Sequence, residues 1–249
     1  MALTNHPDFI EPDWPAPATV KAVVTTRNTG ESLPPFDSFN LAGHVEDSPE
    51  HVQANRQLLR QTLQLPAEPV WLQQVHGIRV VRAELAAEVE IADASTTEEF
   101  NTVCTVMTAD CLPVLICNQA GDQVAAVHAG WRGLVGGILE TSVNTFQQPG
   151  EELIAWLGPA IGPEAFEVGD EVRQMYVEAD ADLAEAFVTG KPGKWYLDIY
   201  QAARTRLEKL GVSEIHGGGL CTHTDAARFY SYRRDGVTGR MASMIWITA

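Results

Sequence analysis

Several kinds of segment are missing from this 249-residue sequence, and each absence excludes a class of protein. The chain has only 4 cysteines and no Cys-x-x-Cys pair, which excludes a disulfide scaffold, a zinc ribbon and a thioredoxin-type redox motif. No run approaches about 18 consecutive apolar residues, so we expect no transmembrane helix. The first residues form neither a basic nor an apolar signal region, so the sequence predicts a cytoplasmic protein.

Positive charge is also scarce. The chain has 17 Lys and Arg against 33 Asp and Glu, a formal net charge of −16 and a pI near 4.7. Non-specific binding to nucleic acid or to an anionic membrane needs clustered positive charge, so we expect neither partner. A small anionic ligand is still compatible with this balance, because a few local arginines can outweigh the global field. Nothing in the sequence indicates an oligomeric state.

The remaining composition is that of an ordinary globular protein, with 45% hydrophobic and 20% charged residues. We expect a single α/β (α+β) domain over residues 1–249, a layered sandwich of mixed β-sheets and helices, with residues 1–18 as an extended lead-in. Strands are predicted at Val20–Thr26, Val70–His76, Arg79–Arg82, Val103–Thr108, Leu112–Cys117, Gln123–His128, Leu153–Leu157 and Met241–Thr248. Helices are predicted at Ser48–Leu63, Leu134–Phe146, Glu167–Val177, Ala181–Phe187 and Asp198–Leu210.

Three apolar segments each carry a side chain that can bind a metal where a strand gives way to Gly or Pro. They are His76 in QVHG, Cys111 in TADCLP and His128 in VHAGWRG. Together they would form a Cys-His-His zinc site whose fourth tetrahedral position stays open, the pattern of a catalytic site. The alternative is three satisfied buried side chains, since a free cysteine is often part of a core.

At these segments the sequence resembles a known family. QVHG, TADCLPVLI, AVHAGWRGL, LGPAIGP and FYSYRRDGVTGR resemble, in this order, the YfiH family, also called the polyphenol-oxidoreductase laccase domain or peptidoglycan editing factor family. The resemblance continues in TTR, SFNLAGHVEDSPEHVQANR and ADASTT, and it covers about residues 14–247. Two places depart from the pattern. Asn28-Thr29-Gly30 stands where the family usually has a Gly-Gly pair, and Glu46 stands where Gly is usual.

The resemblance implies a function and a fold. Family members bind zinc through the residues that are His76, Cys111 and His128 here, and their layered α/β sandwich is similar to that of toxin deamidases with a Cys-His pair. Reported activities are phosphorolysis of adenosine, inosine, guanosine and methylthioadenosine, and deamination of adenosine. Nucleosides and phosphate are therefore the expected small-molecule partners. Other members are linked to peptidoglycan-precursor editing or were named copper polyphenol oxidases.

The copper and cytidine-deaminase chemistries fit the residues poorly. A multicopper cluster needs many histidines, mostly as His-x-His pairs, whereas this chain has 7 histidines and no such pair. A single Cys-His-His site could still bind copper adventitiously. His44-Val45-Glu46 matches half of the cytidine-deaminase signature, but no Pro-Cys-x-x-Cys follows.

Zinc-dependent phosphorolysis needs cationic partners for phosphate. Arg132, between two glycines and at a possible helix start, is the best-placed candidate. Arg27 and Arg233 are weaker candidates. A surface or structural ion pair is the alternative for each, and it is the better interpretation for Arg234 and Arg240.

Three further polar residues are candidates for the site. Asp110 is expected to act as a base or as an orienting carboxylate, and capping a turn is an equal alternative. Asn40 and Gln74 would read a nucleobase or a ribose, against the alternative of hydrogen bonds that form turns.

Two other classes of function use the same residues. Without metal, Cys111 and His128 would act as a nucleophile pair for acyl transfer, which is the mechanism expected of an editing hydrolase. A non-enzymatic zinc-binding module is the other alternative, although three ligands with an open position are unusual for a structural site.

Overall fold

The computed structural model describes residues 8–86 and 89–249, so the first seven residues of the predicted lead-in lie outside it. The strands are β1 (Phe9–Ile10), β2 (Val20–Thr25), β3 (Leu72–Gln73), β4 (Val80–Arg82), β5 (Glu90–Ile91), β6 (Ala94–Thr97), β7 (Cys104–Thr108), β8 (Leu112–Asn118), β9 (Val124–Ala129), β10 (Leu153–Leu157), β11 (Glu167–Gly169), β12 (Phe187–Thr189), β13 (Lys194–Leu197), β14 (Glu214–Gly217) and β15 (Met241–Ile247). The α-helices are α1 (Pro49–Leu63), α2 (Trp131–Gly136), α3 (Ile138–Val143), α4 (Asp170–Ala179), α5 (Ile199–Lys209) and α6 (Tyr232–Asp235). Short 3₁₀ turns cover Ala83–Leu85, Gly150–Glu152 and Ala181–Ala186.

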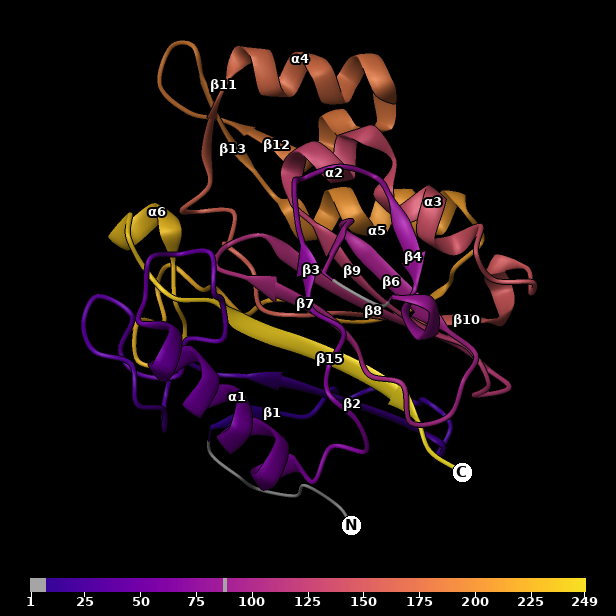
Figure 1. Cartoon of the computed structure of the whole chain (residues 1–249). Helices are drawn as coiled ribbons and strands as arrows, with labels where there is room; N and C mark the ends of the chain where they lie inside the picture. The colour runs from indigo at the N-terminus through magenta and orange to yellow at the C-terminus, as the bar shows by residue number, and fades with distance from the viewer. Residues whose placement is uncertain (1–7, 87–88) are drawn as a thin grey trace.

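Two β-sheets lie face to face at the centre of the molecule (Figure 1). One has the strand order β1-β2-β15-β7 and the other has the order β14-β10-β8-β9-β6-β4. Alternate residues of each strand face the space between the sheets, as the two-residue period of a strand requires. On β15, for example, Ile245 and Ile247 pack into this inner core with Leu115 of β8, whereas Met244 points to the opposite face.

Helices cover the outer face of both sheets. The buried side of α1, with Leu59 and Leu63, packs on the four-stranded sheet against Val23 and Met244. Residues of α2, α3 and α5 pack on the six-stranded sheet, for which Leu139 is one anchor. The result is four layers in the order helix, sheet, sheet, helix. The layered α/β sandwich predicted from the sequence is therefore confirmed, and no helix in the described segments is long and apolar enough to cross a membrane.

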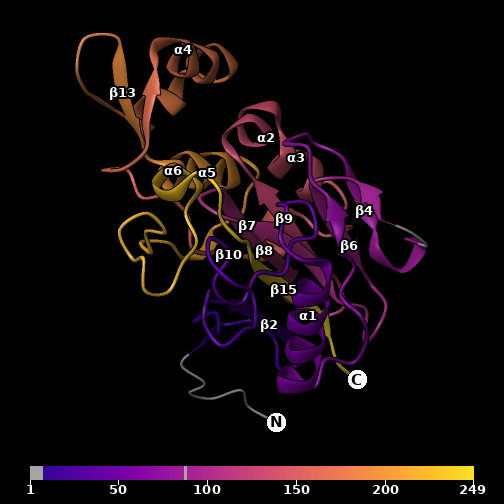
Figure 2. The same cartoon turned by 60° about the vertical axis from the view of Figure 1, so that its left-hand side comes forward.

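A small lobe projects from this sandwich (Figure 2). It consists of the sheet β11-β13-β12 and the helix α4. Two predictions need correction here. The predicted helix Glu167–Val177 begins only at Asp170, because residues 167–169 pair with β13 as a strand. The predicted helix Ala181–Phe187 is a 3₁₀ turn that ends at Ala186.

The predicted helix Leu134–Phe146 is also wrong in detail. The chain forms two short helices, α2 and α3, because Gly137 between them adopts φ 102°, a left-handed conformation that interrupts an α-helix. The predicted strand Val70–His76 shortens to the pair Leu72–Gln73, since His76 turns away with φ 60°.

Sequence patterns located α1 and α5 well. The helix α1 begins at Pro49 after Ser48, as predicted, and α5 follows Asp198, whose carboxylate accepts hydrogen bonds from the backbone N–H groups of Tyr200 and Gln201 at 3.0 Å. The chain then leaves α5 through Gly211 at φ 87°.

The two departures from the family pattern share a backbone conformation. Thr29 has φ 76° and Glu46 has φ 67°. Both lie in the left-handed region, which a glycine adopts without the steric cost of a Cβ atom. This conformation explains why glycine is usual at these places in the YfiH pattern. In this chain, Thr29 and Glu46 adopt it with backbone strain.

Candidate metal centre and its pocket

Antiparallel pairing places two of the three candidate ligands side by side. In the register of β8 and β9, Leu112 pairs with Ala129 and Pro113 pairs with His128. Cys111 directly precedes β8 and His128 lies near the end of β9. Because the two strands are antiparallel neighbours, both residues lie at the same end of this strand pair in the six-stranded sheet. This register explains how residues 17 positions apart meet at one site.

The third candidate ligand comes from the turn after β3. The ligand atoms of His76, Cys111 and His128 all lie within 4.8 Å of one another. The Sγ atom of Cys111 is 3.6 Å from Nε2 of His76, and the two imidazole rings meet edge to face with centroids 4.8 Å apart. His128 is buried, Cys111 is partly buried and His76 is exposed. Two imidazoles and a thiol therefore lie together at this end of the six-stranded sheet.

One buried carboxylate fixes two of these side chains. Asp93, which is fully buried, accepts a hydrogen bond from Nδ1 of His128 at 2.8 Å. It also accepts the backbone N–H groups of Val75, His76 and Gly77 at 3.2, 2.8 and 2.7 Å. With the proton on Nδ1, the Nε2 atom of His128 is left to face the site. Asp93 thus holds the turn that carries His76 beside β9.

The space between the three side chains suits a single ion. A Cβ atom added to Gly130 would lie 2.8 Å from Cδ2 of His76, 3.1 Å from Sγ of Cys111 and 3.4 Å from Nε2 of His128. The glycine therefore keeps open a small space that any other residue would fill. A thiolate with two imidazoles is a donor set that zinc binds, so the residues present fit the metal that the family implies.

The charges of the site favour a thiolate beside an imidazolium in the metal-free protein. Burial alone would raise the pKa of the Cys111 thiol, but the neighbouring His128 outweighs it and lowers the pKa to about 6. Burial would lower the pKa of His128, but the Cys111 thiolate and the Asp93 carboxylate raise it to about 9. Hydrogen bonds from His128 and from the Gly77 N–H likewise outweigh burial and hold the pKa of Asp93 below its usual value.

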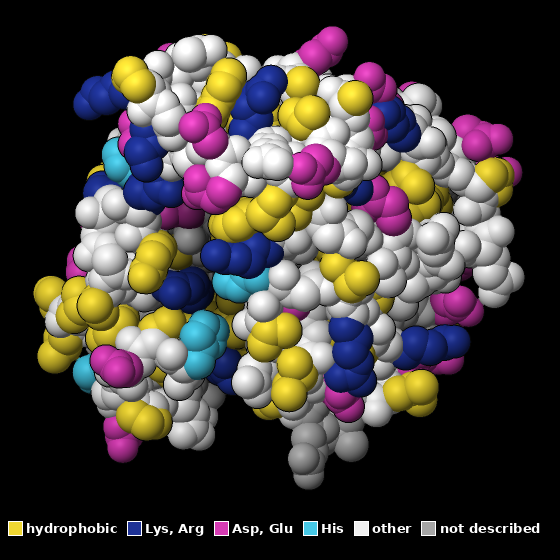
Figure 3. Space-filling model, turned by 90° about the horizontal axis from the view of Figure 1, so that it is seen from above, with side chains coloured by type: hydrophobic (Ala, Val, Ile, Leu, Met, Phe, Trp, Pro, Cys, Tyr) yellow, Lys and Arg dark blue, Asp and Glu magenta, His cyan; other side chains and the backbone are white. Residues whose placement is uncertain are grey.

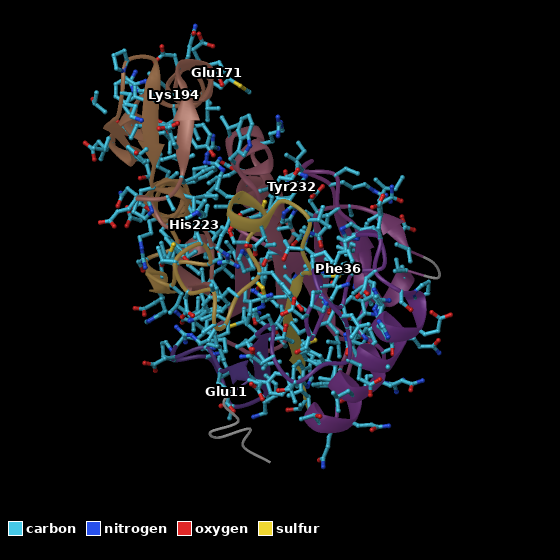
Figure 4. All side chains as sticks on the ribbon, turned by 90° about the vertical axis from the view of Figure 1, so that its left-hand side faces the viewer. Glu11, Phe36, Glu171, Lys194, His223 and Tyr232 are labelled. Carbon is cyan, nitrogen blue, oxygen red and sulfur yellow. The ribbon has the colours of Figure 1, made fainter. Side chains whose placement is uncertain are left out.

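The metal-competent side chains line a cavity of about 460 Å³. Figure 3 shows basic and histidine side chains gathered beside a hollow on this face of the molecule. Apolar lining comes from Met107, Ile161, Phe166 and Ile199. Tyr232, which is labelled on α6 in Figure 4, also lines the cavity and is 62% exposed.

Three of the substrate-binding residues predicted from the sequence line this cavity: Arg132, Arg233 and Gln74. The guanidinium of Arg132 lies 4.2 Å from the centre of the Trp131 ring, and that of Arg233 lies 5.3 Å from the Phe166 ring. The amide of Gln74 is already paired, since it donates to the carbonyl of Met107 and accepts from its N–H, both at 2.8 Å.

Asp110 also lines the cavity, but its carboxylate is occupied by protein donors. One oxygen accepts from the Thr222 hydroxyl at 2.6 Å, and the other accepts from the Ser231 hydroxyl at 3.0 Å and from the Arg233 N–H at 2.6 Å. These contacts tie the residue before Cys111 to the segment that carries Tyr232 and Arg233. They favour the orienting role over the role of a base.

Two predicted substrate-binding residues lie outside the cavity lining. Arg27 donates to the carbonyl oxygens of Asp37 and Ala226 and stacks on Tyr230. Asn40 is fully buried, donates to Ala42 and Asp47, and accepts from the Arg240 N–H. Both therefore hold loops together, which was the alternative interpretation for each.

Three residues at the site were not predicted from the sequence. The only sequence signal for Asp93 was its position in the ADASTT motif. The only signal for His44 was the partial match of His44-Val45-Glu46 to the cytidine-deaminase signature. Arg240 was interpreted as a structural ion pair, yet it lines the cavity. His44 lines it as well, where burial and the charges of Arg240 and Arg56 lower its pKa, so that its imidazole is neutral at pH 7.

Comparison with known proteins agrees with the motifs. Residues 21–248 match the family described as multi-copper polyphenol oxidoreductase laccase. The chain belongs to this family. A protein of Escherichia coli named purine nucleoside phosphorylase YfiH is 53% identical over 241 residues, which cover 96% of this chain and 98% of that protein. Membership of the YfiH family, expected from the sequence, is therefore confirmed.

Further proteins are similar to this chain in sequence or in fold. A purine nucleoside phosphorylase of Pseudomonas aeruginosa is 54% identical over 240 residues, covering 96% of this chain and 98% of that protein. A Neisseria meningitidis protein of known crystal structure matches with a TM-score of 0.94 and 46% identity, over 97% of this chain and 100% of that one. YlmD from Geobacillus stearothermophilus matches with a TM-score of 0.90 and 30% identity, over 98% of both chains.

Proposed function

We propose that this protein is a zinc-dependent purine nucleoside phosphorylase that acts on adenosine, inosine, guanosine and methylthioadenosine, with deamination of adenosine at the same site. The observation that carries the proposal is a single cavity that joins the His76-Cys111-His128 cluster to several arginines. The names of the Pseudomonas and Escherichia relatives, at more than half identity over nearly the whole chain, support the same activity.

We assign part of the cavity lining to each component of the reaction. Phosphorolysis breaks the bond between the ribose C1′ and the base nitrogen and forms a bond from C1′ to a phosphate oxygen. The arginines of the lining would hold the phosphate, since guanidinium groups match its oxygens in pairs. The apolar wall with Ile161 and Phe166, and the exposed ring of Tyr232, would pack on the purine and the ribose.

His76, Cys111 and His128 would hold the zinc ion, and Asp93 would keep two of them oriented. A bound zinc ion would supply a Lewis acid and positive charge beside the reacting atoms. The donor set favours zinc over the copper of the family description, because one Cys-His-His group lacks the His-x-His pairs of a multicopper cluster.

The proposal is tested by turnover of inosine and adenosine with and without phosphate. Zinc-loaded wild-type protein is expected to release free base only when phosphate is present, and Cys111→Ala is expected to lose this activity while keeping its fold. Metal analysis of the same preparations distinguishes zinc from copper. Absence of phosphate-dependent base release from the zinc-loaded wild type would remove the phosphorylase assignment.

A second function is favoured by one observation, the arrangement of Cys111 beside His128, whose Nδ1 donates to Asp93 at 2.8 Å. This order of thiol, imidazole and carboxylate is that of a cysteine hydrolase, so a peptidoglycan-precursor editing hydrolase in the cytoplasm is the alternative. The two functions respond to metal in opposite ways. Chelation would abolish the phosphorylase, whereas it would free the thiolate of a hydrolase.

A further inference from the structure

The three arginines that line the cavity differ in their surroundings. Arg132 and Arg233 are exposed, and the guanidinium of each lies over an aromatic ring. Arg240 is only partly exposed and comes from the segment that leads into β15, at the far end of the chain from the other ligand-bearing motifs. It is therefore the most buried of the three arginines of the cavity.

Backbone contacts fix one edge of the Arg240 guanidinium. Its Nη1 donates to the carbonyl oxygens of Thr238 at 2.8 Å and Gly239 at 2.9 Å, and its backbone N–H donates to Oδ1 of Asn40 at 3.0 Å. Gly239 packs so closely that an added Cβ atom would lie 2.7 Å from the ring of Tyr230. The loop that carries Thr238, Gly239 and Arg240 is therefore held tightly. Nε and Nη2 of Arg240 donate to no acceptor among the described residues.

No carboxylate in the described ranges forms an ion pair with Arg240. Among the described residues Arg132 and Arg233 form no ion pair either, but both are exposed to solvent, which screens their charge. Burial lowers the pKa of Arg240, and it outweighs the opposite effect of Cys111, Asp110 and Tyr232. Asp110 is no substitute for an ion-pair partner, because protein donors already occupy both of its oxygens.

A half-buried cation without a counter-ion carries a desolvation cost that a bound anion would offset. The two unused N–H edges of a guanidinium fit two oxygens of a phosphate. Arg240 lines the same cavity as His76, Cys111 and His128, so such an anion would lie beside the metal-competent cluster. His44 also lines the cavity, and its pKa is lowered. As a neutral imidazole it would donate a hydrogen bond to the anion without placing a second buried positive charge in the cavity.

We propose that Arg240 is the principal binding group for the phosphate co-substrate, and that Arg132 has a lesser role. This inference rests on the proposed phosphorylase function and assigns the anion site within it. It reverses the ranking expected from the sequence, where Arg132 was the first candidate and Arg240 was interpreted as structural.

The experiment compares Arg240→Met with Arg132→Met in the zinc-loaded protein. Inorganic phosphate binding is measured by calorimetry, and the KM for phosphate is measured at saturating inosine. Loss of a charge-assisted contact of about 1.5–3 kcal/mol predicts that Arg240→Met weakens phosphate binding about 10- to 150-fold. Arg132→Met is expected to change it less than about 3-fold, and Arg240→Lys to retain part of the affinity.

Arg60→Met is the matched control for loss of a positive charge, because Arg60 lies on α1 and pairs with Glu68 at 3.2 Å away from the cavity. Thermal melting and zinc content establish that each variant is folded and loaded. If Arg240→Met does not fold, the comparison is made with Arg240→Lys and Arg240→Gln.

Two results would overturn the inference. One is a phosphate affinity in Arg240→Met within about 3-fold of wild type, and the other is a larger loss in Arg132→Met. Calorimetry needs no turnover, so it decides the role of Arg240 even if inosine is not cleaved. Failure of phosphorolysis with intact, Arg240-dependent phosphate binding would count against the proposed function alone.

Discussion

Oδ1 of Asp93 lies 2.8 Å from Nδ1 of His128, and the same carboxyl group accepts the backbone N–H of His76. A single buried acid therefore determines the orientation of one candidate ligand and the position of another. It joins the β3 turn to the end of β9, and the cluster depends on this connection.

Replacing Asp93 with Asn is expected to weaken zinc binding about 10- to 100-fold, the usual effect of losing the carboxylate behind a metal-binding histidine. The amide would keep the volume of the side chain but could not accept all four hydrogen bonds. Competition with a chromogenic chelator measures the affinity. Asp182→Asn, an exposed acid paired with Lys209, serves as the control, and unchanged affinity in Asp93→Asn would refute the role of Asp93.

Gly130→Ala tests the space at the centre of the cluster. The added methyl group would lie 2.8 Å from the His76 ring, so the cluster must open and zinc affinity should fall at least 10-fold. Gly130 has φ −61° and ψ 156°, which alanine adopts freely, so the free energy of unfolding of the metal-free protein should change by less than about 1 kcal/mol.

Gly43→Ala is the control, because a Cβ atom there meets nothing within 4 Å. Calorimetric zinc titration and urea denaturation measure the two quantities. Normal zinc affinity in Gly130→Ala would show that the metal does not sit among these three side chains.

Alkylation of the metal-free protein should report the pKa of Cys111. Because the thiolate is the reactive form and the pKa is about 6, the rate with iodoacetamide should rise from pH 5 to pH 7 and then level off. Cys104 and Cys117 are buried with pKa values raised to about 12, so they should stay unreactive. A Cys221→Ser background removes the remaining partly exposed thiol.

In that background, zinc should suppress the reaction, and Cys111→Ser should abolish it. A rate that begins to rise only near pH 9 would show that His128 does not stabilise the thiolate.

Glu46→Gly should stabilise the protein by about 1 kcal/mol, because it removes a Cβ atom from a residue at φ 67°. The Glu46 side chain is exposed and forms no hydrogen bond or ion pair with other described residues, so little is lost with it. Gly137→Ala, at φ 102°, should have the opposite sign. Urea denaturation measures both, and a destabilised Glu46→Gly variant would contradict the strain at this residue.

The sequence predicted those parts of the fold that local patterns determine. Strands β7 to β10 are short apolar runs, and α1 and α5 follow capping residues, so their existence followed from composition and position. The break at Gly137 did not, because one glycine within a helical pattern is compatible with a continuous helix. The strand β13 was also not predicted. Lys194–Leu197 is short, and its partners β11 and β12 are three-residue strands without a clear hydrophobic alternation.

In the site, too, local sequence patterns predicted some residues, whereas others depend on contacts between distant segments. Cys111 and His128 were recognised because each ends or begins an apolar strand within a long motif. Asp93 and Arg240 acquire their places through contacts with distant segments: Asp93 with the turn after β3, and Arg240 with Asn40. How far each arginine is buried depends on the folded arrangement, so no local pattern ranked Arg240 above Arg132.

The most direct test of the account is to follow the fate of phosphate in a reaction of inosine with the zinc-loaded protein by ³¹P NMR. The account predicts a sugar phosphate resonance that grows in step with free hypoxanthine, and no product in Cys111→Ala. Hypoxanthine without a sugar phosphate, or no hypoxanthine from the zinc-loaded wild type, would contradict it.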